Sequence, residues 1–377
     1  MRLKHRPRAR LAPERTPLAK EIRRRINSSG PLPVAEFMRL CLTHPEHGYY
    51  SRQMPIGANG DFITAPEISQ KFGELMGLWA AAAWRAMGSP DNVRLVELGP
   101  GRGTLMLDIL RAANVLPAFR AALVLHMVEV RPVLQGLQRQ ALAPTGVSLS
   151  WHTSLQEVPA GPIIILANEF IDSLPVNQAV MCADGWHERV VKLDDHGNLR
   201  FGFAKDPIPL VEQLLPNGIR GAKIGEIFEW RADEIALEIG RRVTKSNGVA
   251  LVFDYGHARS ALGDTLQAVR GHDYADPLQA PGLVDLTAHV DFQAFGLAAE
   301  GMGARVHGPI TQAAFLRRLG IAQRAAALKG AAAPSSAMAI DAAVERLTNE
   351  GRTGMGSLIK VVALSSPTLD SLPAFDE

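Results

Sequence analysis

Short apolar runs alternate with helix-like segments along the chain from Val93 onward. VRLVEL, ALVLHMVEV, VSLSW and PIIILANEF are rich in apolar residues, whereas TLMLDILRAA and RPVLQGLQRQAL repeat apolar positions every three or four residues. Strands that alternate with helices indicate a parallel sheet with crossover helices. Continuous apolar strands are typical of a sheet that is buried on both faces. GVALVFDYG and SLIKVVALS add two later strands, so the pattern predicts an α/β fold.

The segments outside this alternation have other patterns. Residues 15–50 predict helices separated by a turn at GPLP, residues 44–69 predict a long ordered loop, and residues 70–87 predict another helix. Residues 179–247 alternate in polarity and then become helical, which predicts an inserted antiparallel meander followed by one long helix. We expect this insertion to shape the acceptor side, because ligands of open α/β sheets bind outside the carboxyl ends of the strands.

These patterns predict an organisation in three parts. Residues 1–92 would form N-terminal helices and an active-site loop, residues 93–363 the core with its insertion at 179–247, and residues 364–377 a C-terminal tail. The biased stretch KGAAAPSSA at 329–337 predicts a mobile surface loop.

Composition places the chain among ordinary globular proteins. Apolar residues make up 47% of its 377 residues and charged residues 21%. The net charge of +2 gives no argument for a nucleic-acid partner. No apolar run reaches the roughly 18–20 residues of a membrane span.

Location is predicted from the cysteines and the N-terminus. Cys41 and Cys182 are too few for a disulfide framework, which favours a reducing compartment. The start MRLKHRPRAR is Arg-rich, but early glutamates argue against a transit peptide. We therefore expect a cytoplasmic bacterial protein, or a protein of the mitochondrial matrix if the source is eukaryotic.

The stretch ELGPGRGTLMLDIL indicates a ligand. Gly99, Gly101 and Gly103 lie between a buried strand and a helix, where glycines let a ligand approach the backbone. The dinucleotide fingerprint is G-x-G-x-x-G, and here the third glycine comes one residue early. Glu97 would repel a pyrophosphate but attract a cation. S-adenosyl-L-methionine carries two cationic groups and no phosphate, so the loop predicts this cofactor. A nicotinamide or flavin site and a turn with incidental glycines remain alternatives.

The second strand ends at Glu129. An acid at this place can accept hydrogen bonds from the ribose hydroxyls of an adenosine ligand. It does not distinguish S-adenosylmethionine from NAD, and a solvated acid at a strand end is the alternative.

Four stretches together resemble the MidA-like family of class I S-adenosylmethionine-dependent methyltransferases. They are GDFITAPEISQKFGELMGLW (60–79), ELGPGRGTLMLDILR (97–111), ANEFIDSLPVNQ (167–178) and VDLTAHVDF (284–292). The resemblance implies a Rossmann-like, mostly parallel seven-stranded sheet with an N-terminal helical extension and insertions. It also implies methylation of a protein arginine, with a subunit of respiratory complex I (NADH-quinone oxidoreductase) as partner during assembly.

The chain departs from two better-known groups of methyltransferases. It has neither the paired glutamates on a hairpin nor the T-H-W element of the main protein arginine methyltransferases, and Asn168 lacks the prolines of an N-P-P-Y motif. The acceptor chemistry of those enzymes therefore cannot be transferred to this chain.

Candidate acceptor residues follow the fourth strand, in NEFIDSLP. A guanidinium is a poor nucleophile, and carboxylates can hold it bidentately and orient one nitrogen. Glu169 and Asp172 are three residues apart and would share a face of a helical turn, while Asn168 could orient a nitrogen. The alternative is a turn in which these side chains only cap the backbone.

GDFITAPEIS supplies further candidates. Phe62 could cover the methionine end of the cofactor, Thr64 could bind its carboxylate, and Glu67 could reach the guanidinium. The alternative is the start of a helix, with Pro66 in its first position and Glu67 in its first turn.

Histidines allow two interpretations. His257, His272 and His289 match no common zinc spacing, so no metal is predicted. His289 could instead act as a base near the acceptor.

Three functions are compatible with the sequence. They are a protein arginine methyltransferase, a non-catalytic assembly factor that keeps the fold, and an NAD-type oxidoreductase. The last is disfavoured by the glycine spacing and by Glu97. A homo-oligomer is compatible with each of them.

Overall fold

The computed structural model describes residues 16–52, 64–216, 219–271, 273–330, 333–351 and 354–375. Within these ranges, seven strands form one continuous sheet in the order β15-β16-β10-β5-β2-β3-β4. The strands are β2 (Val93–Leu98), β3 (Leu123–Val128), β4 (Leu149–His152), β5 (Ile163–Asn168), β10 (Val249–His257), β15 (Arg305–Thr311) and β16 (Ile359–Ser365). β16 runs antiparallel to both neighbours, and β4, β3, β2, β5 and β10 are parallel. A short strand, β14 (Val290–Asp291), pairs with the end of β10. The expected seven-stranded, mostly parallel sheet is confirmed.

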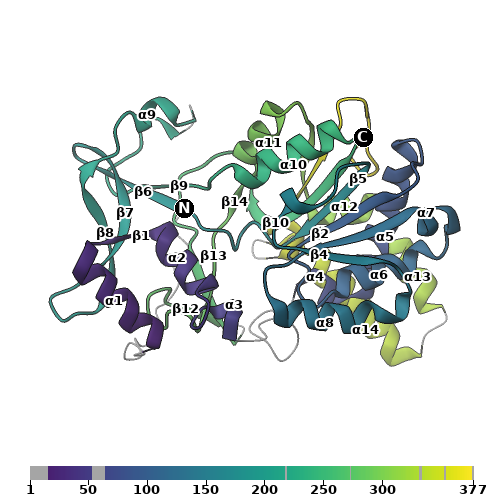
Figure 1. The fold of residues 1–377 in the computed structure, drawn as a ribbon, viewed down its shortest axis with the longest axis horizontal. Coiled ribbons are helices and arrows are strands. Elements are labelled where there is room, and N and C mark those ends of the chain that lie inside the picture. Colours follow the sequence, from purple (N-terminus) through teal and green to yellow (C-terminus); the bar gives the residue numbers. More distant parts are fainter. Residues whose placement is uncertain are drawn as a thin grey trace.

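Helices cover both faces of this sheet (Figure 1). Neighbouring residues of a strand point to opposite faces, so Ile164 joins one apolar core, and Ile163 and Ile165 join another. The first core includes side chains of α5 (Gln70–Ala86), α6 (Thr104–Ala113) and α12 (Gln312–Arg318), and the second those of α10 (Glu234–Lys245) and α11 (Phe292–Gly301). The other helices of this part are α4 (Ala65–Ile68), α7 (Pro117–Ala122), α8 (Pro132–Leu142), η1 (Ala143–Thr145), η2 (Leu155–Glu157), α13 (Ile321–Lys329), α14 (Pro334–Thr348) and α15 (Met355–Leu358).

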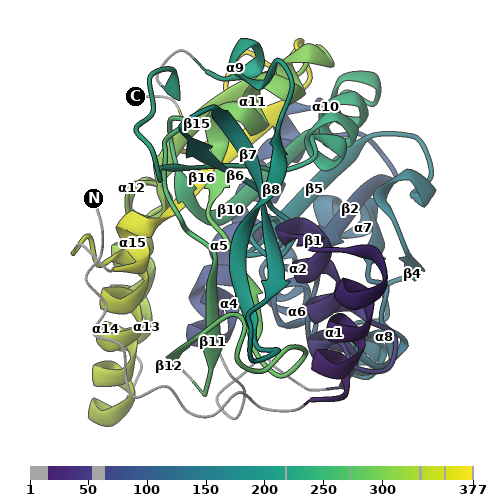
Figure 2. The ribbon, with the colours of Figure 1, turned by 90° about the vertical axis from the view of Figure 1, so that its left-hand side faces the viewer.

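Three stretches that are distant in sequence form a second lobe, which comprises the described residues within 16–52, 177–230 and 258–288 (left side of Figure 1, facing the viewer in Figure 2). Phe37, Val191 and Leu286, one from each stretch, share its apolar core. Its elements are α1 (Pro17–Ser29), β1 (Leu32–Pro33), α2 (Val34–Thr43), α3 (Tyr49–Arg52), β6 (Asn177–Cys182), β7 (Gly185–Leu193), β8 (Leu199–Pro207), α9 (Val211–Leu214), β9 (Ile227–Trp230), β11 (Gln267–Arg270), β12 (Asp273–Ala275) and β13 (Asp285–Thr287).

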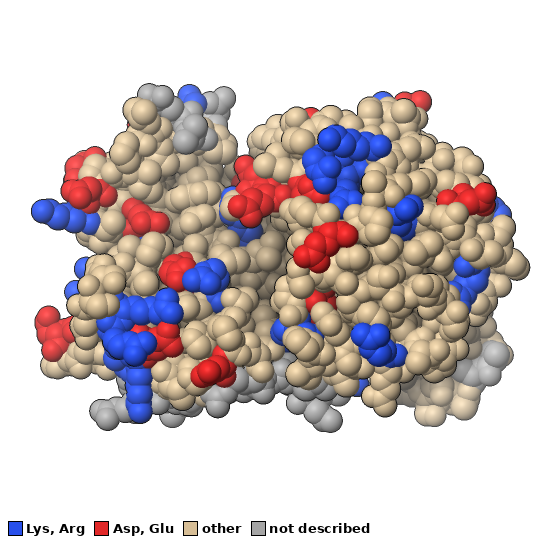
Figure 3. Space-filling model, viewed as in Figure 1, with Lys and Arg blue, Asp and Glu red and all other residues tan. Residues whose placement is uncertain are grey.

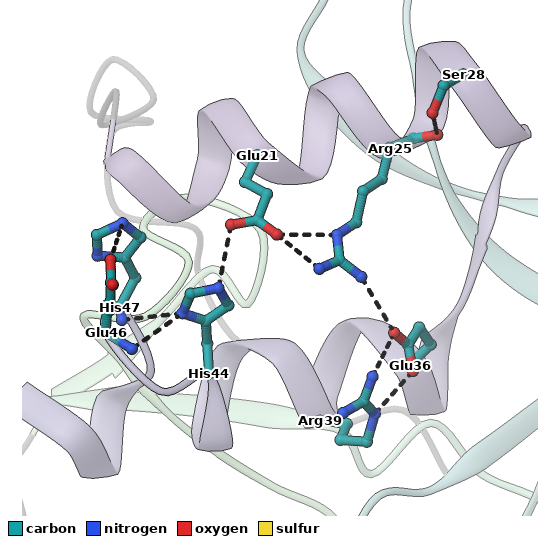
Figure 4. A network of polar contacts seen from close by, with 8 residues as sticks. All are labelled: Glu21, Arg25, Ser28, Glu36, Arg39, His44, Glu46 and His47. Carbon is teal, nitrogen blue, oxygen red and sulfur yellow. Dashed lines mark hydrogen bonds and ion pairs between the residues drawn. The ribbon is translucent and has the colours of Figure 1, made fainter.

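Ion pairs connect the two long helices of the second lobe (Figure 4). Glu21 of α1 accepts hydrogen bonds from Arg25 and lies 3.1 Å from Nε2 of His44, which follows α2. Arg25 also approaches Glu36 of α2 at 3.8 Å, and Glu36 pairs with Arg39. Such partly exposed pairs add little stability individually, so the apolar core must hold the lobe together.

Two expectations about secondary structure are wrong. The single long helix expected toward residue 247 is strand β9 followed by helix α10, because Phe228 and Trp230 pair β9 with β6. α10 packs against the main sheet, so it belongs to the core and not to the insertion. Within KGAAAPSSA, residues from Pro334 onward begin helix α14, since proline suits the first turn of a helix.

The second lobe joins the core at the carboxyl ends of β5 and β10, because its second stretch follows the turn after β5 and its third follows β10. The space-filling view shows a groove between the two lobes (Figure 3). No helix in the described ranges is long and apolar enough to cross a membrane.

Candidate functional site

The glycine loop lies between β2 and α6 in a conformation that other residues rarely adopt. Gly99, Gly101 and Gly103 have φ angles of 61°, 54° and 83°, in the left-handed region that favours glycine. A Cβ atom at Gly99 would lie 2.7 Å from the ring of Phe170, in the turn after β5. The loop therefore packs directly against the segment that carries the acceptor candidates.

Glu97 lies at the end of β2 and is buried. The backbone amide of Met106 in α6 bonds its carboxylate, and its Oε2 has no hydrogen-bond partner among the described residues. Burial raises the pKa of this carboxyl to about 8. An unpartnered buried oxygen of this kind fits the cation that the sequence predicts, because a positive group would compensate the charge.

Glu129 is also buried, directly after β3. Its Oε1 accepts hydrogen bonds from the backbone amide of Arg131 at 3.0 Å and from Nε of Arg131 at 3.3 Å. Its Oε2 lies at the limit of hydrogen bonding, 3.5 Å from Nε2 of Gln138. Oε2 is thus the less engaged oxygen and fits a hydroxyl donor such as a ribose.

Gln138 connects three parts of this site, a role that sequence reasoning missed. It is fully buried in α8, and its Nε2 donates to the carbonyl of Gly101 at 2.8 Å. Its Oε1 accepts from Nε1 of Trp151 in β4 at 2.8 Å. Gln138 therefore fixes the glycine loop relative to Glu129 and β4. A single polar residue on the buried side of a helix gives no motif by which it could have been found.

Glu169 begins the turn after β5 in a left-handed conformation, with φ of 50°. Its Oε1 accepts hydrogen bonds from the amide of Ala65, at 3.0 Å, and from Nδ2 of Asn168, at 3.3 Å. Burial and the nearby Asp172 raise the pKa of Glu169 to about 7. Oδ1 of Asn168 is buried and has no partner in the described parts of the chain.

Asp172 lies deeper in the same turn. It is 5% exposed, and burial raises its pKa to about 6 against the opposing charge of Arg231. The expected helical face shared by Glu169 and Asp172 is not formed, since the left-handed backbone at Glu169 makes the segment a turn. Asp172 therefore stays near Glu169 but faces the protein interior.

The backbone of this turn is held from both sides. Oδ2 of Asp254 in β10 accepts the amides of Phe170, Ile171 and Asp172 at 3.2, 2.7 and 3.1 Å. Asp254 is thus a structural acid that fixes the backbone of the turn.

Arg231, which follows β9, holds the other side of the turn and was not found from the sequence. Its guanidinium donates to the carbonyls of Asp172, Leu174, Ala288 and His289. It joins the acceptor turn to the VDLTAHVDF stretch, although nothing in the local sequence distinguishes it from a surface arginine.

Glu67 is engaged with the glycine loop. Its Oε1 accepts a 2.6 Å hydrogen bond from the hydroxyl of Thr104, and its Oε2 lies 3.9 Å from Arg102. Thr64 precedes α4, and its carbonyl accepts the amides of Glu67 and Ile68. This stretch is thus the start of helix α4, as the second alternative expected, and the roles of Thr64 and Glu67 toward the ligands stay predictions. Phe62 lies outside the described residues.

His289 is poorly suited to act as a base. Burial and neighbouring cationic groups lower its pKa to about 4, so the imidazole is neutral and weakly basic near pH 7. Its backbone amide donates to Thr265. His272 lies outside the described residues, and no group of three potential metal ligands occurs within them.

Comparisons with known proteins show which family the chain is related to. Residues 75–310 match a family model described as S-adenosyl-L-methionine-dependent methyltransferases. The chain is 37% identical over 378 residues to the mitochondrial protein arginine methyltransferase NDUFAF7 homolog of Drosophila melanogaster, covering 92% of this chain and 84% of that protein. It is 38% identical to human mitochondrial protein arginine methyltransferase NDUFAF7, covering 81% and 74%.

A solved structure extends the match to the whole fold. A protein from Burkholderia thailandensis, crystallised with S-adenosyl-homocysteine, is 29% identical with a TM-score of 0.81, covering 97% of this chain and 98% of that one. The chain therefore belongs to the MidA-like family of S-adenosyl-L-methionine-dependent methyltransferases, with S-adenosyl-L-methionine as its cofactor.

Proposed function

We propose that the enzyme transfers a methyl group from S-adenosyl-L-methionine to an arginine of a protein partner. The names of its curated relatives support a protein arginine as acceptor. One observation carries the proposal: the carboxylate of Glu169 lies next to the cofactor loop. Glu169 has a left-handed backbone in the turn after β5, and the residue that follows it, Phe170, packs against Gly99 of the loop.

The donor half of the site consists of Glu97, the glycine loop and Glu129. Oε2 of Glu97 would bind the ammonium group of the cofactor, and Oε2 of Glu129 would accept from its ribose. The bound cofactor supplies an electrophilic methyl group on its sulfonium. The protein's contribution is then alignment, which can lower the barrier by about 7–11 kcal/mol in favourable cases.

Glu169 and Asn168 form the acceptor half. The Glu169 carboxylate pairs with the incoming guanidinium. The side-chain Oδ1 of Asn168, which has no partner in the described structure, accepts a hydrogen bond from a second guanidinium nitrogen. Methylation leaves the arginine nitrogen with a proton to lose. Glu169, with its pKa near 7, accepts this proton better than His289, with its pKa near 4.

Partner and location are further parts of the proposal. The family resemblance favours a complex I subunit that is methylated during assembly. We place the enzyme in the bacterial cytoplasm, or in the mitochondrial matrix if the source is eukaryotic, since the curated relatives are named mitochondrial.

A transfer assay tests the proposal. The purified enzyme is incubated with methyl-labelled S-adenosylmethionine and protein from cells that lack its gene, and the hydrolysed product is analysed for methylated amino acids. We expect labelled methylarginine with the wild type. Glu169→Gln should give about a hundredfold less, the usual contribution of an acid–base group, while its affinity for S-adenosyl-homocysteine stays within about threefold. Label in lysine or glutamine, or an unaffected Glu169→Gln variant, would contradict the proposal.

A further inference from the structure

A chain of contacts runs from the donor side to the acceptor side through the second lobe. It starts at Glu129, passes through Arg131 and Tyr50, and ends at Ser173 in the acceptor turn. Glu129 and Arg131 follow β3 in the core, whereas Tyr50 belongs to α3 in the second lobe.

Arg131 is the first link of this chain. While its backbone amide and Nε bind Oε1 of Glu129, its Nη1 donates to the carbonyl oxygen of Tyr50 at 2.9 Å. The guanidinium also lies over the Tyr50 ring, 4.7 Å from its centre. The Arg131 side chain is 19% exposed and that of Glu129 4%, so solvent screens this pair weakly.

Tyr50 is the second link. Its hydroxyl hydrogen bonds with the side chain of Ser173, and the Ser173 hydroxyl donates to the carbonyl of Phe170 at 2.9 Å. Since the Ser173 proton is used in that bond, the Tyr50 hydroxyl is the donor to Ser173. Burial and nearby carboxylates raise the pKa of the Tyr50 phenol, so it keeps the proton that this bond needs.

We propose that Arg131 and Tyr50 are positioning residues that couple occupation of the donor site at Glu129 to the geometry of the acceptor turn. Ribose hydroxyls that bind Glu129 share its carboxylate with Arg131 and thereby change how Arg131 is held. Arg131 contacts both the carbonyl oxygen and the ring of Tyr50. A change in the position of Arg131 is therefore transmitted through Tyr50 directly to Ser173.

Coupling of this kind is reciprocal, so a group that orders the acceptor turn also favours donor binding. Its consequence for turnover rests on the proposed function. The coupling itself rests only on donor binding and can be measured without an acceptor.

Hydrogen exchange with and without saturating S-adenosyl-homocysteine measures the coupling. The enzyme is compared with Tyr50→Phe, which removes the hydroxyl and keeps the ring under Arg131, and with Arg131→Met, which removes the guanidinium. Tyr274→Phe is the matched control, because Tyr274 lies on the exposed strand β12. Thermal unfolding shows that each variant is folded, and calorimetry gives its affinity for the ligand.

In the wild type and the control, we expect ligand binding to slow exchange in residues 49–52 and 169–174, on the order of fivefold. In Tyr50→Phe, residues 49–52 keep this protection and residues 169–174 lose it, with the dissociation constant changed less than threefold. In Arg131→Met, both segments lose it. If residues 169–174 of Tyr50→Phe keep the wild-type level of protection, the coupling proposal is overturned. That result would not bear on the separate proposal that the acceptor is a protein arginine.

Discussion

The ionisation of Glu97 links donor binding to pH. With a pKa raised to about 8 by burial, most of this carboxyl is protonated at pH 7, whereas an adjacent ammonium favours the ionised form. Binding should therefore expel close to one proton at pH 7, and affinity should increase as pH rises toward 8.

Calorimetry of S-adenosyl-homocysteine binding in two buffers with different ionisation enthalpies checks this release. Glu97→Gln is the control, because it keeps the shape of the side chain and cannot titrate. Equal apparent enthalpies in the two buffers for the wild type would show that Glu97 does not meet the cation.

At this scale, sequence reasoning found the residues that belong to motifs. Glu97 and the three glycines are recognisable because a fixed spacing joins them to a strand end and a helix start. Gln138 and Arg231 were not predicted as site residues, because their roles depend on hydrogen bonds to backbone carbonyls that are distant in sequence. Local sequence does not encode those contacts.

The glycine loop is the element with the strictest conformational demand. Gly101 has a φ of 54° and accepts the Gln138 amide on its carbonyl. A β-branched residue there costs about 1–2 kcal/mol or more in the left-handed region, and its side chain would project where the backbone must approach the cofactor.

We expect Gly101→Val to weaken binding of S-adenosyl-homocysteine more than a hundredfold, with circular dichroism unchanged. Gly136→Ala in α8 is the matched control, since a Cβ there meets nothing within 4 Å. It should bind the ligand normally and be slightly more stable, because alanine favours a helix. Near-normal binding by Gly101→Val would place the ligand away from the loop.

Elements of the core were predictable, whereas β9 was not. Strands β5 and β10 contain continuous apolar runs, which are typical of a sheet buried on both faces. Strand β9 has four residues and is separated from α10 by only a few more. The sequence pattern therefore predicted these residues as the beginning of the helix that follows.

The second lobe arises only at the scale of the whole molecule. β1 pairs with β7 through Leu32 and Val191, residues far apart in sequence. No local pattern encodes such a pairing, so the N-terminal helices and the meander were predicted as separate parts. The third stretch, 258–288, has only strands of three or four residues and was not predicted at all.

Lobe and core should unfold together, since Arg131 of the core bonds Tyr50 of the lobe, and Arg231 bonds both Asp172 of the core and Ala288 of the lobe. Phe37 of α2 is fully buried in the lobe, and Phe37→Ala should lower the free energy of unfolding by about 3–5 kcal/mol. Arg39→Ala, at an exposed ion pair, should cost at most about 1 kcal/mol. Urea unfolding should show one shifted transition. Two transitions, with only the first displaced by Phe37→Ala, would mean that the lobe unfolds independently.

Arginine methylation in the cell tests the central claim most directly. Mass spectrometry of complex I subunits is compared between cells with the gene, cells without it, and cells that carry Glu169→Gln. The account predicts a methylated arginine that disappears without the gene and is not restored by the variant. A subunit arginine methylated equally in all three strains, with no other methylarginine lost, would contradict it.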